Sequence, residues 1–228
     1  KISGATTILM TVQEIQKKMR ELTINSNENE SINIAKPCVF PDSVVSDTNV
    51  HIMDEFCERY GLDRVELDLR YDVKEDRIVF PMYFDNKVID GIGRAINDSI
   101  KPKWKRYADA SSGFIRGNCL IAVVVEDCIS ASVVETLGLT GIAILGTNLT
   151  QQHIFSLQQY KKVIVALDPD AAPKTIAYTK ELKANGIDAF ALKLLDDIKY
   201  RRAEDIQYLE KLKREFMNGI PTIKESTK

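Results

Sequence analysis

Two short apolar segments, about forty residues apart, constrain the fold of this chain more than any other feature. Residues 120–125 end on Glu126, and residues 163–167 end on Asp168. Both segments are rich in β-branched residues and almost free of polar ones, which is typical of strands buried on both faces of a parallel sheet. The sequence therefore predicts an α/β fold built on a central parallel sheet.

The C-terminal half alternates between strand and helix patterns. We expect strands at 120–125, 141–145, 162–167 and 187–193, with helices at about 129–137, 150–160 and 173–185 between them. Such alternation implies right-handed crossovers between parallel strands, with helices flanking the sheet. A last helix over about 202–218 is indicated by apolar residues at helical spacing.

The N-terminal half has a different pattern. Helical spacing predicts helices over 11–23 and from Asp47 or Thr48 to Gly61. Alternating apolar residues predict antiparallel strands around 65–69, 78–82 and 88–94, with a hairpin near 85–86. We therefore expect a smaller α+β subdomain over residues 1–117, followed by an α/β domain with a C-terminal helix over 118–228.

Composition limits the class of protein. The net charge of -2 means that any nucleic-acid surface must be local. The four cysteines are scattered without a C-x-x-C pair, which argues against a disulfide framework or a zinc site and favours a reducing compartment. We expect a cytoplasmic protein without a membrane partner, because no apolar run reaches roughly 18 residues and no signal peptide opens the chain. Lys1 in place of a methionine suggests a fragment of a longer polypeptide.

Acidic residues follow several of the predicted strands. Glu126 follows the first, and Asp168 and Asp170 follow the third. The carboxyl ends of parallel strands are where open α/β sheets bind ligands, and clustered carboxylates repel each other unless a cation is present. The sequence therefore predicts a Mg²⁺ or Mn²⁺ site for phosphate chemistry on nucleotides. Asp196 or Asp197, after the last strand, is a candidate further ligand.

Each of these acids also has a structural interpretation. Glu126 alone could be a solvated loop carboxylate, Asp170 could cap the following helix, and the pair at 196–197 could form a solvated turn. Thr147, after Gly146, could bond a phosphate or a site carboxylate, or help to cap the next helix. The sequence contains no G-x-x-x-x-G-K-[ST] motif, so it has no P-loop.

A basic segment with aromatic residues precedes the first buried strand. A local stretch of this kind suits phosphate contact and base stacking, although a solvated charged loop is the alternative. The candidate nucleotide- or template-binding residues of this segment are Arg94, Lys101, Lys103, Trp104, Arg106 and Arg116.

These motifs together resemble the Toprim family, and specifically the bacterial and phage DNA primases. The Toprim pattern is a strand ending in glutamate, a Gly-Thr after the next strand, and a strand ending in Asp-x-Asp. In this sequence those elements are Glu126, Gly146 with Thr147, and Asp168 with Asp170. Residues 126–131 resemble the phage variant, because an aspartate follows the glutamate where glycine is usual.

The upstream segments resemble the basic subdomain that precedes Toprim in primases. The matching segments are 77–81, Gly93 with Arg94, 101–104, and 114–117, where arginine stands for lysine. Trp104 takes the aromatic position of a Pro-Lys-Tyr motif. Asp197 with Lys199 is the nearest match to the family's third acidic motif.

The resemblance implies a DNA primase that joins ribonucleotides on a single-stranded DNA template. It implies a catalytic set of Glu126, Asp168 and Asp170, which with Asp197 would bind metal, in an arrangement where two ions could stabilise the attacking and leaving oxygens. Residues that include Arg94, Lys103, Arg116 and Lys199 would contact phosphates. The implied partners are ribonucleoside triphosphates, template DNA, a replicative helicase and a zinc-binding module, in the host cytoplasm for a phage protein.

Two alternatives share the acidic motif. A metal-dependent Toprim nuclease would cleave DNA and would not need the basic subdomain. A non-catalytic nucleic-acid or nucleotide-binding module would keep the fold with an inert site.

Overall fold

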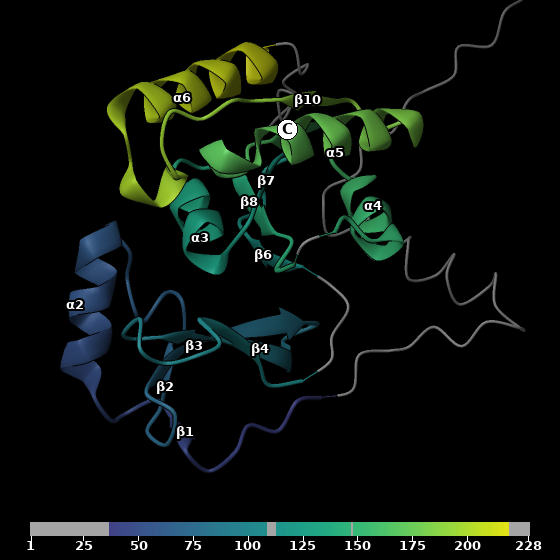
Figure 1. Ribbon diagram of the computed structural model, residues 1–228. Helices are drawn as coiled ribbons and strands as arrows, with labels where there is room; N and C mark the ends of the chain where they lie inside the picture. Colours follow the sequence, from purple (N-terminus) through teal and green to yellow (C-terminus); the bar gives the residue numbers. More distant parts are fainter. Residues whose placement is uncertain (1–36, 109–112, 147, 219–228) are drawn as a thin grey trace, which may run out of the picture. The chain divides into compact units, whose positions relative to one another are not determined.

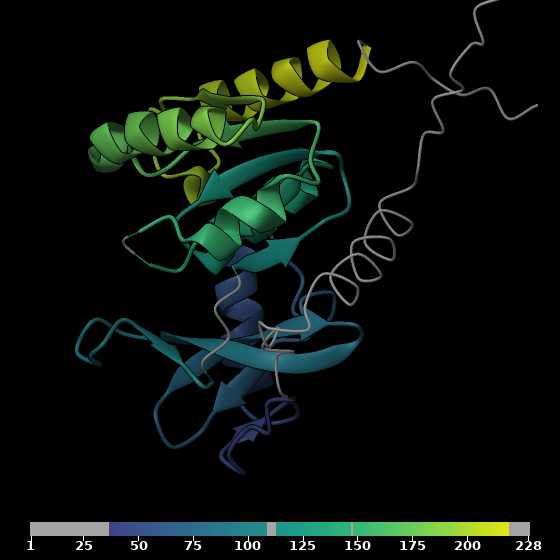
Figure 2. The same cartoon turned by 90° about the vertical axis from the view of Figure 1, so that its right-hand side faces the viewer.

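The computed structural model describes residues 37–108, 113–146 and 148–218, which belong to one compact unit. The helix predicted over 11–23 lies outside these residues. The described residues form two five-stranded sheets, one before and one after the gap at 109–112 (Figures 1 and 2). The domain boundary expected at Gly117 stays a prediction.

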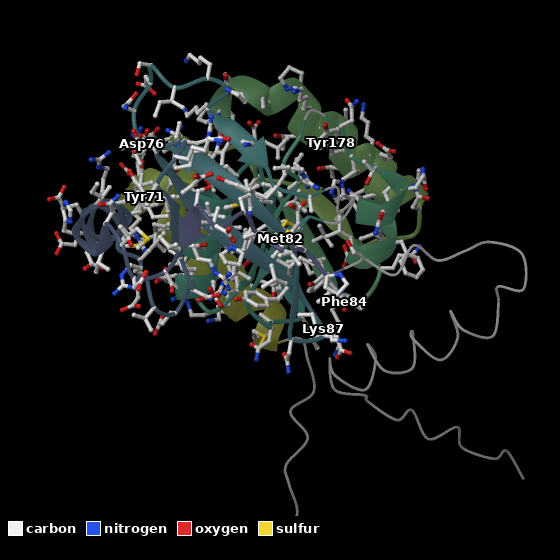
Figure 3. All side chains as sticks on the ribbon, turned by 90° about the horizontal axis from the view of Figure 1, so that it is seen from below. Tyr71, Asp76, Met82, Phe84, Lys87 and Tyr178 are labelled. Atoms are coloured by element: carbon white, nitrogen blue, oxygen red, sulfur yellow. The ribbon has the colours of Figure 1, made fainter. Side chains whose placement is uncertain are left out.

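The first sheet is antiparallel, and its strands follow one another in chain order. Its strands are β1 (Val44–Val45), β2 (Arg70–Asp72), β3 (Arg77–Phe84), β4 (Lys87–Ala95) and β5 (Trp104–Arg106). The predicted hairpin is confirmed, because Asp85 and Asn86 join β3 to β4 and both have positive φ angles, of 52° and 59°. Figure 3 labels Phe84 and Lys87, which face each other beside this turn.

The strand predicted around 65–69 is wrong. These residues form a turn, since the Asp63 carboxylate accepts the backbone N–H groups of Val65 and Glu66 at 2.7 and 2.9 Å. A side chain that binds its own downstream backbone competes with a strand ladder. The pairing begins only at β2, where Arg70 is opposite Val79 of β3.

The helix α2 (Val50–Tyr60) confirms the helix predicted in this region. Gly61 ends it in the left-handed conformation, which glycine adopts without a Cβ clash. Its N-cap residue is Asn49, not Asp47 or Thr48, and the Asn49 side chain makes no capping hydrogen bond.

The second sheet has the order β10-β9-β7-β8-β6. Four of its strands are parallel, as predicted, whereas β6 pairs antiparallel with β8 at one edge. The strands are β6 (Phe114–Arg116), β7 (Ile121–Val125), β8 (Thr140–Ala143), β9 (Lys162–Val165) and β10 (Ala189–Ala191). The chain order reverses around β7, so β7 and β9 lie side by side at the switch point where open sheets bind ligands.

Helices cover both faces of this sheet (Figure 1). They are α3 (Cys128–Thr136), α4 (Gln151–Leu157), α5 (Ala172–Ala184) and α6 (Ala203–Asn218), with short 3₁₀ turns η1 (Pro169–Ala171) and η2 (Ile198–Tyr200). Gly141 of β8 faces α3 so closely that a Cβ atom would lie 2.0 Å from the Ala131 carbonyl oxygen. The Phe216 ring of α6 packs against Phe190 of β10, with 5.6 Å between the ring centroids.

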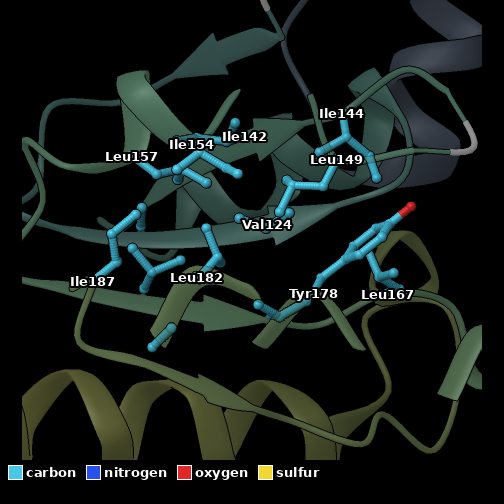
Figure 4. Packing of buried hydrophobic residues seen from close by; sticks show 14 residues of the cluster. Val124, Ile142, Ile144, Leu149, Ile154, Leu157, Leu167, Tyr178, Leu182 and Ile187 are labelled. Atoms are coloured by element: carbon cyan, nitrogen blue, oxygen red, sulfur yellow. The ribbon is translucent and has the colours of Figure 1, made fainter. Parts of the chain in front are cut away.

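The opposite face of the second sheet packs against α4 and α5. Side chains from β7, β8 and β9 form one cluster with these two helices (Figure 4). Val124, Leu157 and Leu182 are fully buried in this cluster. Because the central strands are apolar on both faces, polar residues gather where the strands end.

Aromatic and polar contacts join the two sheets within this unit. The centroid of the Phe80 ring of β3 lies 5.9 Å from that of Phe114 of β6 and 6.2 Å from that of Trp104 of β5. The Arg201 side chain, after η2, donates at 2.7 Å to the Tyr60 carbonyl at the end of α2. Residues of both sheets can therefore line the same cavity.

Candidate active site

Glu126 and Asp168 lie at the carboxyl ends of two neighbouring parallel strands. Glu126 follows β7 directly, and Asp168 follows β9 by three residues. Backbone pairing continues between these ends, because the Ala166 N–H donates to the Val124 carbonyl at 2.9 Å. Both carboxylates line a cavity of about 360 Å³, together with Asp127 and Lys199.

The basic segment forms another wall of this cavity. Lys103, Trp104, Lys105 and Arg106, in and beside β5, line it together with Ile92 of β4. Four cationic and three carboxylate side chains therefore border one space. The acidic wall suits a bound cation, and the basic wall suits an anionic ligand.

Two carboxylates in the cavity, Glu126 and Asp168, hold protons more tightly than ordinary acids. Burial raises the pKa of Glu126, the charge of Asp168 raises it further, and Lys174 opposes both. Burial also raises the pKa of Asp168, and the charge of Lys199 is the largest influence that lowers it. Each charged carboxylate is therefore disfavoured in the protein without a cation.

Asp170 lies outside the cavity lining. It is exposed in η1, two residues after Asp168, and its charge contributes to the raised pKa of Glu126 and Asp168. Asp168 is the N-cap residue of this 3₁₀ turn, and Asp170 lies within the turn. The site role of Asp170 stays a prediction.

Asp127 is a cavity residue that the sequence interpretation did not assign. Its Oδ1 accepts the Ser130 N–H at 2.9 Å and so caps α3, and its Oδ2 lies 3.3 Å from Lys199 Nζ. The signal in the sequence was an aspartate directly before the helix, a position where this residue type is a preferred N-cap. The pairing with Lys199 spans 72 residues and has no local signal.

Asp197 is buried and held by protein groups. Its Oδ1 accepts the Ser130 hydroxyl at 3.0 Å and the Lys199 N–H at 3.2 Å, and its Oδ2 pairs with Lys199 Nζ. Asp197 is not among the residues that line the cavity. These contacts give it a positioning role between α3 and η2, whereas its expected role as a metal ligand stays a prediction.

The cationic residues of β5 have different attachments. Arg106 Nη1 lies 3.2 Å from Oδ2 of the fully buried Asp90, and Lys105 pairs with Glu75. Asp90 also accepts the N–H groups of Gly91 and Ala108, both at 2.7 Å. Lys103 is exposed at the cavity. Lys103 and Arg106 therefore both line the cavity, with Arg106 held by a buried acid, and their role in phosphate contact stays a prediction.

The remaining predicted binding residues that the structure describes are not among those that line the cavity. The Arg94 guanidinium lies 5.4 Å from the Trp104 ring centroid, and its Nη1 is buried without a hydrogen-bond partner among the described residues. Lys101 is exposed beside the cavity-lining segment. Arg116 donates to Glu135 at 2.7 Å and to the Glu66 carbonyl at 3.2 Å, and it does not line the cavity. Thr147 lies outside the described residues.

The donor atoms of this site suit a hard divalent cation. Mg²⁺ is commonly held by one or two carboxylates, with waters and substrate phosphates completing its shell. In the described part of the chain, no three His, Cys, Asp or Glu side chains are grouped so that they could hold a metal ion between them. Glu126 and Asp168 therefore fit Mg²⁺ or Mn²⁺ as a pair of carboxylates that a cation would stabilise.

Comparison with known proteins places this arrangement in a class. Residues 123–198, which contain Glu126, Asp168 and Asp197, match the family model described as Toprim-like. This match includes most of β7 and all of β8, β9 and β10, so this part of the second sheet is similar to a Toprim-like domain. No match was found among the curated proteins.

Solved structures extend the likeness to the first sheet. The zinc-binding and RNA polymerase domains of the Aquifex aeolicus primase match with a TM-score of 0.56 and 20% identity, over 73% of this chain and 55% of that chain. The RNA polymerase domain of Mycobacterium tuberculosis primase DnaG matches with a TM-score of 0.50 and 17% identity, over 89% of this chain and 78% of that chain. The fold is therefore that of a primase RNA polymerase domain, which confirms the resemblance. This chain spans just over half of the Aquifex fragment.

Proposed function

We propose that this chain is a DNA primase domain that synthesises short RNA primers on single-stranded DNA during replication. One observation supports the proposal above all others. Glu126 and Asp168, from the parallel sheet, line the same cavity as Lys103 and Arg106, from the antiparallel sheet. A polymerase needs carboxylates for a cation and basic residues for phosphates in one place, and both are present.

The acidic wall is assigned to the cation. Glu126 and Asp168 would hold Mg²⁺ or Mn²⁺, and the exposed Asp170 adds negative charge at the rim. A bound divalent cation would neutralise phosphate oxygens and favour the deprotonated form of the attacking 3′-hydroxyl. The protein holds these two acids half-buried at fixed strand ends, so little reorganisation is needed when the substrate binds.

The basic wall is assigned to the phosphates of the triphosphate and the template. Arg106 is positioned by the buried Asp90, and Lys103 reaches the cavity from the exposed side. Trp104 presents an apolar surface to the same space, with Arg94 over its ring. Phosphoryl transfer depends mainly on positioning and charge neutralisation, which these residues would supply. Lys101 and Thr147 stay candidate contacts at the edges of this site.

The proposed partners follow from this function. They are ribonucleoside triphosphates and single-stranded DNA, with a helicase and a zinc-binding template-recognition module on other parts of the polypeptide or on separate chains. We propose that the protein acts in the cytoplasm. No helix among the described residues has the length and apolar character needed to cross a membrane.

A direct assay tests the proposal. The protein is incubated with single-stranded DNA, labelled ribonucleotides and Mg²⁺, and with a labelled DNA duplex in a parallel reaction. Short RNA products that depend on the template would support a primase. DNA cleavage without RNA synthesis would identify a Toprim nuclease, and binding of DNA or nucleotide with neither reaction would identify a non-catalytic module. A supplied zinc-binding module is the control for template recognition.

A further inference from the structure

The Lys199 side chain lies at the centre of a buried charge cluster beside the cavity. Its Nζ is 3.3 Å from Asp127 Oδ2, and it also pairs with Asp197 Oδ2. The three side chains are 11%, 14% and 10% exposed. Two carboxylates on separate elements hold this ammonium, so its position is fixed by the fold.

The two aspartates of this cluster are already engaged. Asp127 Oδ1 accepts the Ser130 N–H at 2.9 Å, and Asp197 Oδ1 accepts the Ser130 hydroxyl at 3.0 Å. The remaining oxygen of each carboxylate faces Lys199 Nζ. All four oxygens thus have a protein donor, and a metal ion on either carboxylate would lie close to the Lys199 ammonium, which would repel it.

Two carboxylates of the cavity remain for a cation, namely Glu126 and Asp168. They line the cavity together with Lys199. A pair of carboxylates with waters and phosphates is sufficient for one Mg²⁺, whereas a second ion would need further oxygen ligands. Of the other acids, Asp127 and Asp197 are paired with Lys199, and Asp170 is exposed and lies outside the cavity lining.

We propose that this site takes one divalent cation, on Glu126 and Asp168, and that the Lys199 ammonium provides the fixed positive charge that a second ion would otherwise supply. The inference rests on the metal-dependent function proposed above. An ammonium is a compact point charge that stays with the chain, so it requires no second binding event from solution. The substrate triphosphate would then meet one mobile cation and one permanent cation.

The number of bound ions tests this inference. Mn²⁺ alone is titrated into the 228-residue chain and counted by the loss of the free-ion paramagnetic resonance signal. The wild type is expected to bind one ion per chain. Lys199→Gln is expected to bind two, because Asp127 and Asp197 lose their cation and become available. Lys199→Arg keeps the charge and should stay at one, as should Lys193→Gln, which removes an exposed lysine six residues earlier in the sequence.

Thermal melting provides a second readout that does not depend on activity. Lys199→Gln leaves two buried carboxylates without their cation, so without metal it should melt about 5 °C or more below the wild type. Saturating Mg²⁺ should recover more of that loss than it adds to the wild type. An equal Mg²⁺ shift in both proteins would overturn the role assigned to Lys199.

The outcomes separate this inference from the proposed function. Two ions of similar affinity in the wild type would overturn the inference and leave a metal-dependent primase intact. No bound Mn²⁺ in the wild type would overturn both. A count of one in Lys199→Gln would show that Lys199 does not occupy the place of an ion. If that variant does not fold, the wild-type count decides by itself.

Discussion

The Ser130 hydroxyl donates a 3.0 Å hydrogen bond to Asp197 Oδ1, across 67 residues of sequence. Both residues are buried. Ser130 lies in the first turn of α3, four residues after Glu126, and Asp197 precedes η2, which carries Lys199. This contact therefore fixes the position of the Lys199 ammonium relative to Glu126 at the end of β7.

Removing this hydrogen bond should destabilise the fold. Ser130→Ala leaves one oxygen of a buried carboxylate with fewer donors, and a hydrogen bond to a charged group contributes about 2 kcal/mol. The melting temperature should fall by about 4–8 °C. Ser99→Ala, at an exposed serine, is the matched control and should shift it little. A melting temperature unchanged in Ser130→Ala would refute the positioning role of Asp197.

Glu126→Gln should keep or raise the stability of the metal-free protein. The raised pKa of Glu126 means that the folded state penalises its charge, through burial first and then Asp168. Folding stability is therefore lost as pH rises from the ordinary carboxyl pKa through the raised one, and glutamine removes that loss. Urea unfolding at several pH values checks this. A variant clearly less stable than the wild type at pH 7 would indicate a packing role instead.

Lys103→Gln should weaken single-stranded DNA binding in a salt-dependent way. Lys103 is exposed at the cavity, and one phosphate contact to a single strand changes the slope of log K against log salt by about 0.7. Lys161→Gln is the matched control, because Lys161 is exposed at the opposite end of β9. Binding measured by fluorescence anisotropy at several salt concentrations should show a shallower slope only for Lys103→Gln. Equal slopes would indicate that this segment is a solvated charged loop that does not contact phosphates.

Arg106 is a poorer residue for that comparison. Its guanidinium pairs with the fully buried Asp90, so Arg106→Gln should lower stability as well as binding. Removing one partner of a buried pair leaves an uncompensated charge, at a cost of about 3 kcal/mol before discounting for the partial exposure of Arg106. Equilibrium unfolding should show this loss in Arg106→Gln and not in Lys103→Gln.

His153 should make the fold less stable in acid. Burial lowers its pKa, and Arg106 adds to the effect, while the neutral ring accepts the Thr150 N–H at Nδ1. A lowered pKa means that the unfolded chain binds the proton more readily, so stability should fall as pH drops from about 7 to about 5. His153→Gln should show a flatter dependence over this range in thermal melts. An equally steep profile in the variant would exclude His153 as the cause.

Local patterns in the sequence predicted most strands and helices. Features that depend on contacts between distant residues were missed. The apolar strands, the helices between them and the 85–86 hairpin were all recognisable from periodicity and turn chemistry. The alternation at Val65 to Leu69 misled because the Asp63 side chain forms a turn there. Antiparallel β6 was not distinguishable from other short strands, since its pairing with β8 is set by tertiary packing.

The same distinction applies to the candidate site. Glu126 and Asp168 were predicted from their place at the ends of two apolar strands. The ion pairs of Lys199 with Asp127 and of Arg116 with Glu135 were not, because they join residues 72 and 19 positions apart. Asp90 was missed for a similar reason, since nothing local shows that an aspartate within a strand is buried against Arg106.

Primer synthesis by Glu126→Gln and Asp168→Asn measures the central assignment most directly. Both substitutions keep the size of the side chain and remove the negative charge that a cation needs. Glu58→Gln, at an exposed glutamate of α2, is the control. On single-stranded DNA with labelled ribonucleotides and Mg²⁺, we expect each site variant to lose about 100-fold or more of the rate while the control retains it. Near wild-type synthesis by either site variant, from protein that melts normally, would contradict the assignment of the active site to this cavity.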